Sequence, residues 1–330
     1  MFYVINLEDN KGFAIMAANP AIPELLAISD NGNLDLASPP DYGVADFVRR
    51  IGDIFLPIDT AAHELDEIYT VATAWETTSS IPALCKVKWG QNHPFNQYCP
   101  VVNYEHMAAG YDAVAIAQAM SIFGKPTSLN GYTFDWTAMC APEMTDDAVT
   151  QIARLMALIG EYGDFDYLTY YDDEITNAEI EGIIEAMRAC GYENAVGTLG
   201  QDNGTATPYP YSMTTVRNEL EASHPVIARG KKIGKNEPWR AWLLHGFMAR
   251  QREVEKRRET ATGIEILSRS TETQEYVFCN WGRRGRCDGY YLSSAFAFNF
   301  ENPFPEGSST SGPGNYSSEL SIIKNIYPTR

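Results

Sequence analysis

The sequence predicts an α+β protein in which a helical half is followed by an antiparallel β half, with a cleft where the two halves meet. The first observation is residues 108–123, an almost wholly apolar run that has no Pro or Gly after Gly110. Three amphipathic helices are predicted after it, at residues 148–162, 177–190 and 214–222. From Pro225 onward the pattern changes to short strand-like runs. At 330 residues, the chain is long enough for two domains or one large two-lobed domain.

Composition excludes several classes of protein. Hydrophobic residues make up 45% of the chain, with 19 Tyr and 14 Phe, so a large core is expected rather than disorder. The formal net charge of −18 argues against nucleic acid as the partner, because phosphate recognition needs a basic surface. No run of 18 apolar residues occurs, so no transmembrane segment is expected. The chain opens inside a strand-like run, which is typical of a mature or trimmed form.

The N-terminal residues predict a small unit of their own. Strands are predicted at 2–7, 12–18 and 23–29, separated by turn-forming residues. Residues 44–76 have helical spacing, with a break at Pro57. The Thr- and Ser-rich segment 77–82 is the most linker-like piece. We therefore divide the chain into a unit at 1–78 and a main body at 79–330.

The run at 108–123 predicts a buried central helix, since a helix that is apolar all round belongs in a protein interior. Asp112 falls in its first turn, where the helix dipole favours a carboxylate. A helix start can bind an anion and can lower the pKa of a thiol. The residue at that start is Tyr111, which is neither Cys nor Ser.

The β half is predicted to hold strands linked by turns and one arm. These strands are expected at 226–228, 241–248, 263–268, 276–280, 290–292 and 321–326. The mixed-charge run 250–259 predicts an exposed hairpin arm, and 303–318, rich in Pro, Gly and Ser, predicts a surface loop.

Cysteine and histidine positions offer no metal site or cofactor motif. The six cysteines contain no C-x-x-C pair, so most are expected to be buried and free. Cys279 and Cys287 flank a glycine-rich turn, and a bond between them is left open. His245 lies in an apolar strand and is expected to be a core histidine. Cys99 with His106 is a possible relocated dyad, although nothing at Cys99 would activate a thiol.

Several segments together resemble the streptopain (C10) family of cysteine peptidases, a papain-like family. Residues 89–96 are similar to its opening W-x-Q-x-x-P-F-N block, 109–118 to its A-G-C helix start and 132–139 to its Y-x-W-x-x-M block. Residues 239–247 are similar to G-H-A-W-V-I-D-G-Y, and 279–291 to C-N-W-G-W-G-G-x-x-D-G-Y-Y. The N-terminal unit resembles the family's propeptide, or Spi-type inhibitor domain.

The resemblance implies a papain-like cysteine peptidase fold in which the catalytic positions are substituted. The family nucleophile falls on Tyr111 and its general base on Arg240. A phenol with a pKa of about 10 is a poor nucleophile at neutral pH, and an arginine cannot accept a proton. Gln91, at the oxyanion-hole position, is retained. Asn280 and Trp281, which resemble the pair that orients the base, are retained as well.

The same substitutions suggest contacts within the cleft. If the fold is right, the guanidinium of Arg240 stacks on the ring of Tyr111 or donates to its hydroxyl. Arg283 and Arg284 replace the family's second turn Trp and Gly, and Arg286 follows. Together with Arg240 they suggest a basic site for an anionic or C-terminal carboxylate group. The simpler interpretation is a plugged site and a solvated turn.

We therefore interpret the chain as a catalytically inactive peptidase homologue that binds a peptide or protein partner, including a related peptidase, without a cofactor or metal. The alternatives are an active secreted cysteine endopeptidase and a non-catalytic structural or inhibitor protein. Family resemblance implies a secreted or cell-surface protein of a Bacteroides-like bacterium. It also implies an N-terminal unit that covers the cleft and, without self-cleavage, stays attached.

Overall fold

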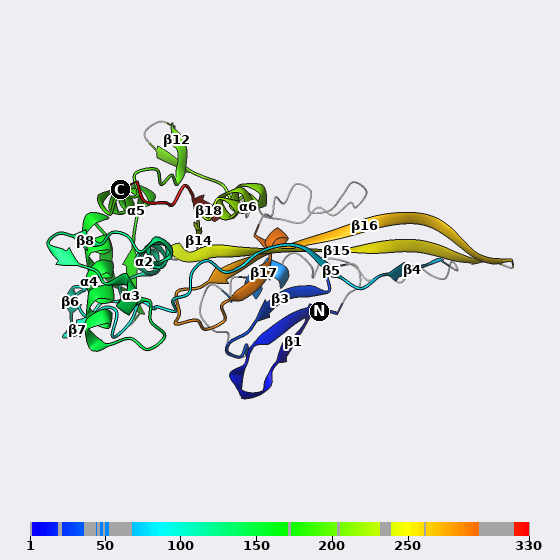
Figure 1. Ribbon diagram of the computed structural model, residues 1–330, viewed down its shortest axis with the longest axis horizontal. Coiled ribbons are helices and arrows are strands. Elements are labelled where there is room, and N and C mark those ends of the chain that lie inside the picture. Colours follow the sequence, from blue (N-terminus) through cyan, green and yellow to red (C-terminus); the bar gives the residue numbers. More distant parts are fainter. Residues whose placement is uncertain are drawn as a thin grey trace.

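The computed structural model describes residues 2–18, 22–35, 44, 47–48, 50–52, 68–170, 173–202, 205–231, 239–260, 262–296 and 320–329. Helices gather at one end of the molecule, a large antiparallel sheet runs through its middle, and a long hairpin extends from the other end (Figure 1). This arrangement confirms the predicted α+β class with a helical half and a β half.

The helical half is built around α2 (Tyr111–Phe123), which is buried along its first ten residues. The predicted central helix is therefore confirmed. It packs on α4 (Asp146–Tyr162), which in turn packs on α3 (Trp136–Met139) and α5 (Ile180–Ala189). α6 (Met213–Glu221) lies against the sheet, over β14 and β15. The three amphipathic helices predicted after α2 thus correspond to α4, α5 and α6.

Ten strands form the sheet, in the order β1-β2-β3-β17-β16-β15-β14-β18, with β4 and β5 paired to β15. Its N-terminal strands are β1 (Phe2–Asn6), β2 (Phe13–Ala17), β3 (Leu25–Ser29), β4 (Ile68–Ala72) and β5 (Glu76–Ile81). Its later strands are β14 (Val226–Lys231), β15 (Trp239–Thr260), β16 (Gly263–Asn280), β17 (Gly289–Leu292) and β18 (Leu320–Ile323).

Four small hairpins and two short 3-10 helices complete the described elements. None of these elements was predicted. The hairpins are β6 (Val101–Val102) with β7 (Glu105–His106), β8 (Ser128–Leu129) with β9 (Tyr132–Thr133), β10 (Asp166–Tyr170) with β11 (Asp173–Asn177), and β12 (Thr198–Asp202) with β13 (Thr205–Pro208). The 3-10 helices are η1 (Glu8–Asn10) and η2 (Ser293–Ala295).

Two predictions for the N-terminal region are wrong. Residues 68–76 were expected to continue a helix, but 68–72 form β4, and the linker-like segment 77–82 is largely strand β5. Both strands pair with the part of β15 that extends beyond β14. This backbone pairing holds the two segments extended, and the local sequence pattern does not predict it. The helical prediction holds for the described residues between 44 and 52, and residues 53–67 lie outside the described residues. The division at residue 78 falls within β5 and stays a prediction.

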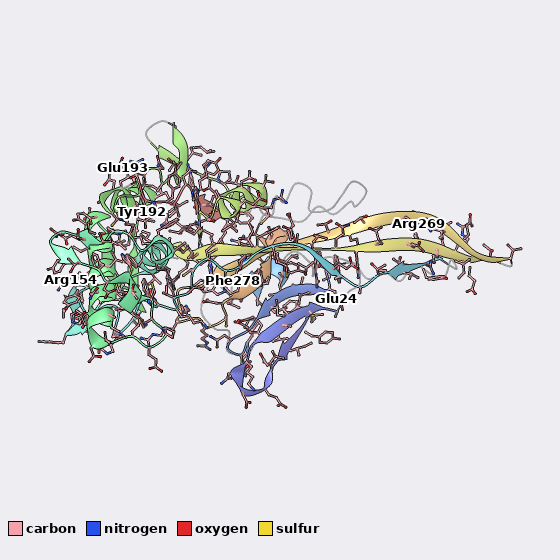
Figure 2. All side chains as sticks on the ribbon, viewed as in Figure 1. Glu24, Arg154, Tyr192, Glu193, Arg269 and Phe278 are labelled. Atoms are coloured by element: carbon pink, nitrogen blue, oxygen red, sulfur yellow. The ribbon has the colours of Figure 1, made fainter. Side chains whose placement is uncertain are left out.

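The hairpin of β15 and β16 is much longer than its apolar content predicts. Pairing runs from Leu243 with Asn280 to Thr260 with Gly263, so the strands predicted at 263–268 and 276–280 are one strand. The predicted exposed arm is confirmed, and Figure 2 shows Arg269 on it, away from the body. The predicted loop at 303–318 lies outside the described residues.

One hydrophobic cluster joins the N-terminal strands to the β half. Phe47 packs edge-on against Tyr291, with ring centroids 4.8 Å apart, and also contacts Phe296. Strand β3 pairs with β17, so that Ile28 lies opposite Tyr290. The N-terminal unit and the body therefore share both a sheet and a core.

Candidate functional site: the start of the central helix

The start of α2 carries the side chain that stands at the family's nucleophile position by resemblance, Tyr111. Gly110, the N-cap, has φ 91°, a left-handed value that glycine adopts without the steric cost of a Cβ. Tyr111 follows as the first helical residue and is only 6% exposed. The phenol thus occupies a position where free backbone N–H groups and the helix dipole would otherwise favour an anion or a thiolate.

Two arginines close over Tyr111. The guanidinium carbon of Arg240 lies 4.8 Å from the centroid of the tyrosine ring, and that of Arg283 lies 5.1 Å from it. Arg283 also donates a hydrogen bond to the hydroxyl oxygen of Tyr111. The predicted stacking of Arg240 on Tyr111 is confirmed. The hydroxyl, however, is held by Arg283.

Three chain segments meet at this point. The amide of Ala109 donates to the carbonyl of Gln91 (2.8 Å), and the amide of Arg284 donates to the carbonyl of Trp89 (3.1 Å). Gly90 and Arg283 form an isolated antiparallel bridge. The structure therefore brings the predicted Gln91 segment, the helix start and the arginine turn together.

Asn280 and Trp281 hold the turn that carries Arg283. The side-chain amide of Asn280 donates to the carbonyl of Val87 (3.1 Å), and its oxygen accepts from the amide of Gly282 (3.0 Å). Trp281 donates its indole N–H to the carbonyl of Cys287 and packs edge-on against Tyr291. Both side chains are buried, so the predicted pair is in place as a support for the turn.

The remaining arginines have separate surroundings. Arg284 is exposed, has φ 57°, donates to the carbonyl of His93 and lies over the ring of Phe95. Arg286 is exposed too, with its side chain beside Gly32 of the N-terminal unit. The predicted basic site is therefore divided, because Arg240 and Arg283 face Tyr111 whereas Arg286 lies toward the N-terminal strands.

A buried ion pair beneath the helix start was not predicted. The guanidinium of Arg229 on β14 donates to the carboxylate of Asp112 at 2.8 Å and to the carbonyl of Ala178 at 2.6 Å. Both charged side chains are at most 4% exposed. Burial raises the pKa of Asp112, and the positive charges of Arg229 and Arg240 oppose that rise. Two charged residues were the signal that could have predicted the pair: Asp112 lies within the apolar run 108–123, and Arg229 directly follows the apolar run 226–228.

Burial raises the thiol pKa of five of the six cysteines. Burial raises the pKa of the Cys85 and Cys99 thiols to about 11 and that of Cys190 to about 12. The pKa values of Cys140 and Cys279 are raised by burial as well. A thiolate, rather than a thiol, is the nucleophile, so these groups are poorly suited to catalysis. No disulfide bond joins Cys279 to Cys287 in the structure, which answers the open question of that bond.

His245 is a core histidine, as predicted, and its ring does not act as a base. It is 1% exposed, its Nδ1 accepts from the amide of Cys85 at 3.2 Å, and burial lowers its pKa to about 3. It lines a small cavity of about 80 Å³ together with Asp288. Burial raises the pKa of Asp288 to about 7, although its carboxylate accepts from the amide of Trp281 (2.9 Å).

The possible relocated dyad, Cys99 with His106, is joined only through the backbone. The ring Nδ1 of His106 lies 2.9 Å from the carbonyl oxygen of Cys99, and the hydrogen bond of the Cys99 thiol involves the side chain of Tyr167. Within the described ranges, no group of His, Cys, Asp and Glu side chains is arranged to hold a metal ion. In the same ranges, no helix combines the length and apolar character needed to cross a membrane.

Comparisons with known proteins agree with this geometry. The profile of the Peptidase C10 family matches residues 89–291, and that of the Spi protease inhibitor matches residues 1–51. The chain therefore belongs to the peptidase C10 family. It consists of a papain-like peptidase fold preceded by a propeptide-like unit.

Individual relatives are distant. The chain is 20% identical to the thiol protease/hemagglutinin PrtT of Porphyromonas gingivalis, over 99% of this chain but 37% of the length of PrtT. A fragment of Prevotella intermedia prointerpain A covers all of this chain and all of its own, with 18% identity and a TM-score of 0.61. Active interpain A covers 76% of this chain and 96% of its own, with 19% identity and a TM-score of 0.50.

Proposed function

We propose that this chain is a catalytically inactive member of the peptidase C10 family that acts by binding a peptide or protein partner. The observation that carries the proposal is Tyr111, which stands at the start of α2 with Arg240 and Arg283 packed against its ring. By resemblance, this is where the family places a thiol and an imidazole. A phenol held by two guanidinium groups has no base to accept its proton, so covalent catalysis lacks a route.

Retention of the surrounding frame supports a binding role. The carbonyl of Gln91 accepts from the helix start, and Asn280 and Trp281 hydrogen-bond the backbone around the arginine turn. By resemblance, the residues at the nucleophile and base positions are changed. Three arginines border this region: Arg240 and Arg283 are half-buried and Arg284 is exposed. They form a locally basic site in a chain whose formal net charge is −18. We propose that an acidic group or a free C-terminal carboxylate of the partner contacts these arginines, because guanidinium groups pair bidentately with carboxylates.

The N-terminal unit is proposed to stay attached. Strand β3 continues the main sheet through β17, and the hydroxyl of Ser29 donates to the carbonyl of Asp288. The segment that was expected to be a linker is strand β5, paired with β15. A protease would need to detach this strand before it could cut there, since proteolysis acts on locally unfolded chain. By family resemblance, we place the protein outside the cell or on its surface.

The test of inactivity is a paired assay with casein and a thiol-directed active-site probe. Wild-type protein is expected to give neither cleavage nor labelling. A Tyr111→Cys/Arg240→His variant, with Arg283→Trp added to free the new thiol from the guanidinium, is expected to take up the probe. A Tyr111→Ala variant is the matched control, since it opens the site without supplying a nucleophile. Cleavage by the wild type, with the probe on another cysteine, would contradict the proposal and favour an active peptidase.

The test of binding uses a peptide with a free C-terminal carboxylate and its amidated counterpart. Binding of the acid form alone, lost in an Arg283→Ala/Arg284→Ala variant, would support the proposed site. Equal binding to the variant would show that the turn is only a solvated or structural element. Limited proteolysis near residues 77–82 would separately contradict permanent attachment if it released a folded body.

A further inference from the structure

Strand β1 forms one edge of the ten-stranded sheet, and within the described ranges no strand pairs with its outer side. In Figure 1 it is the outermost strand of the N-terminal unit. Residues 2–7, Phe-Tyr-Val-Ile-Asn-Leu, contain no charge, Pro or Gly. Phe, Tyr, Val and Ile are the residues that favour strands most. Proteins usually protect such an edge with charges, Pro or a bulge, and β1 has none of these.

The unpaired stretch of β16 is protected. Beyond Glu275, β16 has no partner on its outer side among the described strands, because β17 pairs only with residues 276–279. This stretch carries Glu265, Arg269 and Glu272, and a register shift interrupts it opposite Lys256 and Arg257. Charges and bulges are the devices that prevent edge-to-edge pairing. Strand β1 has neither charges nor a register shift, so its outer side is open to pairing with another strand.

The face of β1 directed to solvent is also apolar. Tyr3 is 57% exposed, Ile5 52% and Leu7 50%. Ile5 lies opposite Ala14, and Ala14 lies opposite Ile28, which is 43% exposed. Since residues opposite one another share a face of the sheet, these side chains form one apolar strip that ends at the free edge.

The backbone direction along β1 follows from one hydrogen bond. The amide of Leu7 donates to the carbonyl of Gly12, so the peptide groups of Leu7 face β2. In an antiparallel ladder, alternate residues direct both backbone groups to the same neighbour. Tyr3 and Ile5 therefore also bond β2, whereas Phe2, Val4 and Asn6 direct their N–H and C=O groups outward.

We propose that β1 pairs antiparallel with β1 of a second copy of this chain, about a two-fold axis perpendicular to the sheet. Such an axis keeps each face on its own side, so outward-directed residues must lie opposite one another. The register with the greatest overlap places Val4 opposite Val4 of the second copy and Phe2 opposite Asn6. Each of these pairs exchanges two backbone hydrogen bonds. Tyr3 then lies opposite Ile5, an aromatic and β-branched pair of the kind that stabilises sheets.

Charge favours this site over the rest of the surface. Two copies, each of net charge −18, repel one another. Contact at the uncharged residues 2–7 places no like charges directly opposite. Added salt should therefore strengthen the association by screening the remaining repulsion. The proposal does not depend on whether the peptidase site is active.

Sedimentation of the full chain over a range of concentrations and at two salt concentrations tests the proposal. The wild type is expected to form dimers with a dissociation constant in about the micromolar range, as for a small interface. Val4→Pro removes an outward N–H without a loss of bonds to β2, and it should weaken association by about tenfold or more.

Two double variants test the register. Tyr3→Lys/Ile5→Lys places lysines opposite lysines and should give a monomer. Tyr3→Lys/Ile5→Glu places opposite charges at the same positions and should restore the dimer. Ile264→Lys/Ile266→Lys on β16 is the matched control and should leave association unchanged. A wild-type protein that stays monomeric at every concentration, or a Lys/Lys variant that associates as well as the Lys/Glu variant, would overturn the proposal. Unchanged unfolding midpoints would show that the variants are folded.

Discussion

A buried ion pair and two ion pairs on the arm have similar geometry but different surroundings. Arg229 and Asp112 lie beneath the start of α2 at 2.8 Å, with side chains 3% and 4% exposed. On the arm, Glu255 accepts from Arg257 at 2.7 Å and from Arg269 at 2.9 Å, and Arg269 is 68% exposed. In the core, a lost partner leaves an unpaired buried charge, whereas on the arm water replaces it. The comparison teaches that burial, rather than distance, decides what a charged contact contributes.

The largest effect is expected when the buried pair is broken. Arg229→Met should lower the free energy of unfolding by about 3–5 kcal/mol, because it leaves the buried carboxylate of Asp112 without its hydrogen-bonded counter-charge. Urea denaturation at pH 7 measures this loss. The control is Arg229→Met/Asp112→Asn, which removes both charges and should recover part of the stability. A single variant that loses less than about 1 kcal/mol would show that water reaches Asp112.

Asp288 is a second buried carboxyl group to set beside Asp112. The hydrogen bond described for its carboxylate comes from the backbone amide of Trp281 rather than from a cation. Its pKa is raised to about 7 by burial and by Asp30, and Lys88 and the amide of Trp281 oppose the rise. The folded state therefore binds its proton more tightly than the unfolded state does. This contribution to stability is present below the ordinary pKa of about 4 and is lost as pH rises toward 7.

Asp288→Asn should remove this pH dependence. Relative to the variant, the wild type is expected to lose up to about 4 kcal/mol of stability between pH 4 and pH 7, as a shift of about three pKa units implies. Denaturation curves of both proteins across this pH range measure the difference. If the two curves stay parallel, Asp288 is ionised throughout and its hydrogen bond from Trp281 is dominant.

Tyr111 gives an intermediate case, since its ring is buried and its hydroxyl contacts a half-buried arginine. Tyr111→Phe keeps the stacked arginines and removes only the oxygen that accepts from Arg283. A loss of about 1.5–3 kcal/mol is expected, as for a hydrogen bond to a charged group. Thermal or urea unfolding measures it, and Tyr132→Phe on the surface is a matched control. A more stable Tyr111→Phe variant would mean that the hydroxyl is strained rather than satisfied.

The smallest effect is expected on the arm. Glu255→Gln removes both ion pairs to Arg257 and Arg269, yet the unfolding midpoint should not change measurably, because these half-buried to exposed pairs on the arm remain in contact with solvent and are screened by salt. A clear loss of stability that persists at high salt would show that the arm depends on these pairs. The difference between burial and exposure would then not account for the comparison.

Local patterns predicted the helical half well. The apolar run at α2 and the three amphipathic helices formed where the sequence pattern placed them, and the mixed-charge run 250–259 formed the exposed arm. The stacking of Arg240 on Tyr111 was predicted once the order of the motifs assigned both residues to one cleft. Periodicity failed for β4 and β5, because their extended conformation depends on backbone pairing with β15, a partner about 180 residues away in sequence.

The sequence by itself determined the α+β class, the buried central helix, the family, and the identity of Tyr111 and Arg240 at the positions where the resemblance implies a thiol and an imidazole, since these depend on residue identity and local spacing. Only the tertiary structure decided that Arg283 holds the hydroxyl of Tyr111, that Asp112 pairs with Arg229, and that the N-terminal strands continue the main sheet. The reason is physical. Periodicity records which face of an element is apolar, but the partner of a buried charge or of a strand edge is set by how distant segments pack.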